Sequence, residues 1–193
     1  MNVKRNQLLM ILLAVTGLVA AALMRRFFDE YILSIVNFIG IYVILAVSLN
    51  ITNGFTGLFS LGHPAFMAIG GYVTAILTLP SMRKSMFLPD LPSWLAGLEL
   101  PFLPAMTAGG ICAALTALII GPPVLRLKGH YLAVATMGFL IIVQVLITNM
   151  DRFTRGPLGL NGLPELTNLW WVYLWVVLVV YVSWKIKFSS YGR

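Results

Sequence analysis

Charged side chains are scarce in this sequence. Asp, Glu, Lys and Arg make up 10% of its 193 residues, and hydrophobic residues make up 60%. Soluble domains carry roughly 25% charged residues, so an ordinary water-soluble domain is excluded. A membrane helix needs about 20 mostly apolar residues, and the sequence contains several uncharged runs near that length. These runs cover residues 8–24, 31–51, 54–79, 105–121, 131–148 and 169–184.

The sequence also lacks the groups that several chemistries require. None of the six runs contains Asp, Glu, Lys or Arg, which argues against the buried ionisable relays of ion- and proton-coupled carriers. There is no G-x-x-x-x-G-K-[ST] loop, so a partner must bind any ATP that is used. The single cysteine, Cys112, excludes an internal disulfide. His63 and His130 stand apart from other metal ligands, so neither a metal nor a cofactor is expected.

The distribution of positive charge predicts an orientation. With the N-terminus inside and six crossings, the inner segments hold seven basic residues and no acids, whereas the outer segments hold six of each. The net charge of +7 then falls on the inner side, as the retention of Lys and Arg in the cytoplasm predicts. Both termini are therefore expected to be cytoplasmic. The basic residues are scattered at helix ends, so nucleic acid is not an expected partner.

The first run, residues 8–24, has the charge and length of a signal peptide as well as of a membrane anchor. Two arginines and two acids follow it, where a small-residue cleavage site would stand. We therefore interpret it as an uncleaved span. The predicted fold is an all-α integral membrane protein with about six transmembrane helices.

Small residues recur at every fourth position of the fourth run. This spacing places them in a strip along one face of a helix. Small side chains let membrane helices approach closely, so the strip predicts helix packing and not a ligand site. Its members are Ala105, Gly109, Ala113, Ala117 and Gly121.

The third run contains an interruption, in the stretch GLFSLGHPAFMAIGGY at residues 57–72. Gly54, Gly57 and Gly62 loosen a helix. Pro64 removes a helical hydrogen bond and disfavours helical backbone at the preceding residue, His63. We therefore predict that this membrane helix is broken near residues 62–64.

Broken backbone survives in a membrane only against protein or a water-filled path. The break therefore predicts a substrate pathway lined by Ser60, Gly62, His63, Pro64 and Phe66. One alternative makes Ser60 and His63 the nucleophile and base of an intramembrane hydrolase, although the G-x-S-x-G elbow is missing. Another alternative is that His63 caps a turn at the cytoplasmic interface.

Three stretches carry a family resemblance. GFTGLFSLGHPAFMAIGGYVTA (residues 54–75) is similar to the pattern G-x-x-G-x-x-S-L-G-H-x-x-F-x-x-I-G-A-Y. RLKGHYLAVATMGF (126–139) is similar to R-L-[RK]-G-x-Y-x-A-[IV]-x-T-[LM], and TRGPLGLNGLP (154–164) to T-x-G-P-x-G-[IL]-x-G-[IL]-P. These are the motifs of the permease subunits of branched-chain amino acid ABC transporters, which the chain resembles over roughly residues 30–193. The second stretch and the glycine-rich loop favour the LivM-like subunit type over its LivH-like partner.

The resemblance implies further site residues. Tyr131 and Thr136 of the second motif join the substrate pathway. The third motif implies an outer loop, whose residues are Thr154, Gly156, Pro157, Gly159, Gly162 and Pro164.

The resemblance also implies a function and a set of partners. The chain would be a non-enzymatic subunit of an importer in the bacterial inner membrane, translocating leucine, isoleucine or valine. Its partners would be a LivH-like permease subunit, two ATPase subunits that bind ATP, and a periplasmic amino-acid-binding protein. Alternatives are a permease for urea or short amides and a non-transporting remnant. Residues 1–193 are expected to form one transmembrane permease domain, the N-terminal portion of such a subunit, ending where an ATPase-coupling helix would begin.

Overall fold

The computed structural model describes residues 15–19, 21–55, 57–127 and 129–189. All regular elements within these ranges are helices. The chain divides into two compact units, which are described one at a time. Unit 1 comprises Met1–Gly57 and Thr167–Arg193, and unit 2 comprises Leu58–Leu166.

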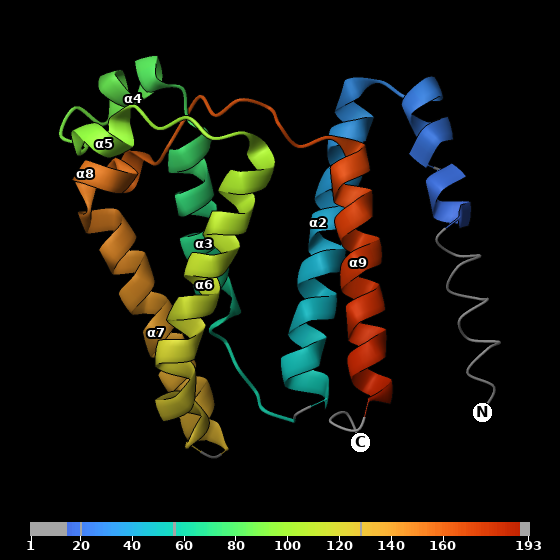
Figure 1. The fold of residues 1–193 in the computed structure, drawn as a ribbon. Helices are drawn as coiled ribbons and strands as arrows, with labels where there is room; N and C mark the ends of the chain where they lie inside the picture. The colour runs from blue at the N-terminus through green and yellow to red at the C-terminus, as the bar shows by residue number, and fades with distance from the viewer. Residues whose placement is uncertain (1–14, 20, 56, 128, 190–193) are drawn as a thin grey trace. The chain divides into compact units, whose positions relative to one another are not determined.

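Unit 1 is built on two helices from distant parts of the sequence. Helix α2 (Glu30–Asn50) and helix α9 (Leu169–Phe188) lie side by side and run in the same direction (Figure 1). A π-helical turn, η1 (Ile51–Phe55), extends α2. Gly40 brings α2 close to α9, because a Cβ at this position would collide with Val172. Residues 15–19 and 21–27 are also helical.

Unit 2 contains three long helices, α3 (His63–Thr78), α6 (Phe102–Leu125) and α7 (His130–Asn149). Helix α3 packs against both of the others (Figure 1). Proline stands directly before three helices of this unit, at Pro80, Pro92 and Pro101. A proline at the start of a helix costs little, because the first N–H groups have no intrahelical acceptor.

One end of unit 2 carries a cap of short elements: α4 (Ser81–Phe87), α5 (Ser93–Ala96), α8 (Asp151–Thr154) and the 3-10 turn η2 (Gly156–Leu158) (Figure 1). Lys84 of α4 is fully buried and donates hydrogen bonds to the carbonyls of Leu95 and Leu98. The Glu99 carboxylate accepts a hydrogen bond from the Ser81 N–H. These polar contacts fix the cap by satisfying backbone groups at the ends of its short helices.

Four helices among the described residues are long and apolar enough to cross a membrane: α2 with most of η1 (Glu30–Gly54), α6, α7, and α9 over Leu169–Lys187. A fifth is added if α3 and α4, bent by 116° at Pro80, form one span. This supports the predicted all-α membrane architecture. The predicted run at residues 8–24 lies partly outside the described residues, which exclude 1–14 and 20.

The structure of the interruption in the third run differs from the predicted break in a continuous helix. Residues 57–62 are not helical and α3 begins at His63, so the segment directly before Pro64 contains no helix for the proline to break. Pro64 lies in the first turn of α3. Its missing N–H costs nothing at this position, and its fixed φ favours the start of a helix.

Candidate functional site

The non-helical segment before α3 is held by a residue of α7. The Leu61 N–H donates a hydrogen bond of 2.9 Å to the Thr136 hydroxyl oxygen, and this hydroxyl donates to the Ala133 carbonyl at 3.0 Å. Gly62 lies beside Thr136, since a Cβ built on Gly62 would be 3.4 Å from the Thr136 Cβ. An unpaired N–H in lipid costs several kcal/mol. Thr136 therefore supports the irregular backbone.

The other predicted pathway residues have different surroundings. Phe66 packs against Phe139 of α7, with the ring centroids 5.2 Å apart. Tyr131, at the start of α7, is 78% exposed. Ser60 and His63 are half-buried. Within the described part of the chain, no group of three His, Cys, Asp or Glu side chains is arranged to hold a metal ion.

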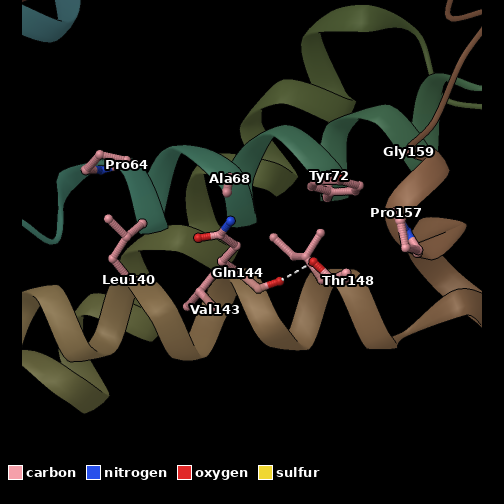
Figure 2. Close-up of a pocket in the computed structure, with 11 residues that line it drawn as sticks. Pro64, Ala68, Tyr72, Leu140, Val143, Gln144, Thr148, Pro157 and Gly159 are labelled. Atoms are coloured by element: carbon pink, nitrogen blue, oxygen red, sulfur yellow. Dashed lines mark hydrogen bonds between the residues drawn. The ribbon is translucent and has the colours of Figure 1, made fainter.

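A groove of about 370 Å³ lies between α3, α7 and the segment after α8 (Figure 2). Small-molecule sites in proteins typically measure about 300–1,000 Å³, so an amino acid fits this space. Of the seven predicted pathway residues, only Pro64 lines it. The lining residues are Pro64, Ala68 and Tyr72 of α3; Leu140, Val143, Gln144, Ile147 and Thr148 of α7; and Gly156, Pro157 and Gly159.

Most of the groove is apolar, and its polar side chains are neutral. Figure 2 shows the Gln144 carboxamide directed from α7 toward α3, near Ala68, with Tyr72 farther along α3. The Thr148 hydroxyl donates to the Gln144 backbone carbonyl at 2.8 Å. The arrangement offers hydrogen-bond donors and acceptors but no charge, which suits a small solute without net charge.

The sequence prediction did not include Tyr72, Gln144 or Thr148. A signal for Gln144 was present, because it is the only amide within the apolar run 131–148. Polar groups inside membrane helices are costly and often functional. The prediction from sequence rested on Asp, Glu, Lys and Arg alone, and a neutral amide such as Gln144 is not among them.

The third motif, residues 154–164, folds onto the end of α7. The Thr154 hydroxyl donates to the Met150 carbonyl at 2.9 Å and to the Ile147 carbonyl, and it accepts the Gly156 N–H at 3.3 Å. Gly156, Gly159 and Gly162 all have positive φ, between 57° and 73°. This region favours glycine, which has no Cβ to clash. The motif therefore builds one wall of the groove.

Further contacts anchor the same loop to α4. Arg83 donates a hydrogen bond to the Gly162 carbonyl. Arg155, with φ of 62°, places its guanidinium 4.3 Å from the centre of the Phe87 ring. Such cation–π contacts are worth about 0.5–2 kcal/mol, and they link the groove wall to the cap. Of the remaining motif residues, Pro157 lines the groove and Pro164 is half-buried.

The small-residue strip of α6 packs within this chain over part of its length. Ala105 is fully buried, and Gly109 lies against Gly70 and Thr74 of α3. Ala113 is also close to Gly70. Ala117 is half-buried, and a Cβ at Gly121 would have nothing within 4 Å. The first half of the strip is thus occupied by α3 and is not free to pack on another subunit.

Comparison with known proteins identifies the family. A family model described as "Branched-chain amino acid transport system / permease component" matches residues 31–193. The chain belongs to this permease family. The three motifs and the whole groove lie within the matched range. The resemblance read from the motifs is therefore confirmed.

Two members of the family share substantial sequence identity with this chain. Over 127 residues it is 36% identical to the "High-affinity branched-chain amino acid transport system permease protein LivM" of Escherichia coli (strain K12). It is 35% identical over 127 residues to the protein of the same name from Salmonella typhimurium (strain LT2). Each alignment covers 66% of this chain and 26% of the relative, so the match spans about a quarter of each relative's length. No solved structure matches the chain.

Proposed function

We propose that this chain is a LivM-like permease subunit of an ABC importer that translocates leucine, isoleucine or valine across the bacterial inner membrane. The observation that carries the proposal is the family match over residues 31–193 together with the names of the two relatives. The neutral, mostly apolar groove of unit 2 supports it, because an aliphatic solute gains stability from apolar contact.

In this proposal residues 1–193 act as one permease domain with both termini in the cytoplasm. Two partner ATPase subunits bind the ATP, and the present sequence contains no P-loop of its own. A LivH-like subunit completes the membrane part, and a periplasmic binding protein delivers the amino acid. Transport follows if the binding protein and ATP favour different conformations of the permease, because ligands shift a conformational equilibrium only by differential affinity.

The function is tested by uptake in cells. A strain lacking the gene for this chain is compared with the same strain carrying the gene on a plasmid, with the partner genes intact. Uptake of radiolabelled leucine, isoleucine and valine is measured beside uptake of radiolabelled urea and a short amide. A strain with an inactive ATPase subunit serves as the control for transport driven by ATP.

The expected result is that plasmid-borne expression restores uptake of the three amino acids and leaves urea and amide uptake unchanged. Restoration of urea or amide uptake alone would favour that substrate class instead. If plasmid-borne expression restores no uptake of any solute, the proposed transport function is wrong.

A further inference from the structure

The groove of unit 2 is divided into an apolar part and a polar part by the register of its two long helices. Lining residues recur every four positions on α3, at Pro64, Ala68 and Tyr72, and the α7 residues Leu140, Gln144 and Thr148 recur in the same way. Figure 2 shows Pro64 facing Leu140, Ala68 facing Gln144, and Tyr72 facing Thr148. Each facing pair forms one level of the groove. A helix rises 1.5 Å per residue, so levels that are four residues apart in sequence lie about 6 Å apart.

Two of the polar side chains have no hydrogen-bond partner within the described residues. These are the Tyr72 hydroxyl and the Gln144 carboxamide, which come from opposite walls of the groove. Each can donate and accept hydrogen bonds. Gln144 is exposed and Tyr72 is half-buried, so both side chains are accessible to a solute in the groove. A ligand that pairs with both would gain hydrogen bonds from each wall.

An α-amino acid has the complementary groups. Its ammonium donates hydrogen bonds and its carboxylate accepts them, so neutral side chains that both donate and accept can pair with the two groups. The solute carries no net charge, in keeping with the absence of charged side chains from the groove lining. A branched aliphatic side chain needs an adjacent apolar surface, which the Pro64–Leu140 level provides. Urea and short amides would leave this apolar level unfilled.

We propose that Gln144 and Tyr72 bind the ammonium and carboxylate groups of an α-amino acid whose branched side chain lies against Pro64 and Leu140. This assignment rests on the proposed transport function and adds the residues that select the solute. The amide of Gln144 accepts from the ammonium and donates to the carboxylate. The Tyr72 hydroxyl donates a second hydrogen bond to the carboxylate. Thr148 closes the polar end of the groove.

The test uses a cysteine in the groove as a reporter of occupancy. Ala68→Cys is introduced into the complete transporter after Cys112→Ser has removed the native thiol. Its reaction with a small polar methanethiosulfonate reagent is followed in membrane vesicles at increasing concentrations of leucine, and separately of urea. Leucine is expected to slow the reaction, and urea is not.

Two variants then test the polar contacts. Gln144→Leu removes the amide at nearly constant size, and Tyr72→Phe removes a single hydroxyl with the smallest change of shape. Hydrogen bonds to charged groups contribute enough that each variant should raise the leucine concentration needed for half-protection about ten- to a hundred-fold. Asn149→Leu is the matched control: this amide lies on the same helix, outside the groove, and donates to the Val145 carbonyl. The leucine concentration needed for half-protection should be the same in this control as in the parent.

Two outcomes would overturn the assignment. In one, leucine protects the Gln144→Leu and Tyr72→Phe variants as well as it protects the parent. In the other, the cysteine at position 68 does not react in any state, which would mean that another helix or lipid fills the groove. Leucine uptake by the unmodified transporter is measured in parallel. Uptake without the expected protection would show that the assignment of Gln144 and Tyr72 is wrong while the transport function holds.

Discussion

The contact between α3 and α6 yields a quantitative prediction for Gly109→Ala. A Cβ at position 109 would lie 2.5 Å from the Gly70 carbonyl oxygen and would also collide with the Thr74 hydroxyl. That hydroxyl donates to the Gly70 carbonyl at 2.8 Å and approaches the Ala105 carbonyl of α6 at 3.4 Å. The backbone oxygen cannot turn aside as a side chain can, so α6 must move away from α3.

The magnitude follows from the general cost of overpacking, about 1–3 kcal/mol. Taking about 2 kcal/mol, and a shift of about 2–4 °C per kcal/mol for a chain of this size, the unfolding temperature should fall by about 4–8 °C. The assay is thermal unfolding in detergent at one fixed heating rate, followed with a thiol-reactive fluorophore. Cys112 is half-buried, three residues beyond Gly109 on α6, and reports exposure of this helix.

Two other glycines of this helix pair provide matched controls. A Cβ at Gly110, the next residue of α6, would meet nothing within 4 Å, and a Cβ at Gly70 would lie 3.4 Å from its nearest neighbour, the Gly109 carbonyl oxygen. Gly110→Ala should leave the unfolding temperature unchanged or raise it, since alanine favours helix, and Gly70→Ala should change it by less than Gly109→Ala. Equal losses at Gly109 and Gly110 would refute the packing argument.

Three further predictions concern orientation, access and pH. Reporter fusions after Glu99 should be periplasmic and fusions after Lys187 cytoplasmic; a cytoplasmic signal after Glu99 would contradict the assigned orientation. Cysteines replacing Ser60 and His63 should react with a polar thiol reagent in the assembled transporter, at a rate that substrate or nucleotide changes, whereas uniform protection would show that these positions are only packed. The hydrogen bond from Ser81 holds the pKa of the Glu99 carboxyl below its ordinary value of 4.5. Its contribution to stability is therefore present above pH 4.5 and is lost as the pH falls through the lower folded-state pKa. The difference in unfolding temperature between the parent and Glu99→Gln should shrink over that acid range, and a difference independent of pH would exclude this linkage.

The sequence by itself determined the membrane setting, the main helices and the family. Apolar runs must become helices in a bilayer, because no water is present to satisfy the backbone. For this reason the run 131–148 predicted α7 (His130–Asn149) to within one residue at each end, and the run 169–184 predicted the start of α9 at Leu169. The motifs around His63 and Thr154 identified the permease family without any structure.

The tertiary structure decided which parts of those helices meet. The groove depends on the register that places Ala68 opposite Gln144. The hydrophobicity of each helix does not determine which residues of two helices face one another. The tertiary structure also decided the form of the predicted break. Pro64 lies at the start of a helix, and the segment before it is held by the long-range hydrogen bond between Leu61 and Thr136. The third motif predicted an outer loop but not its path. Glycines with positive φ permit several loop paths. The hydrogen bonds of Thr154 to the end of α7 select the path that makes this loop a wall of the groove.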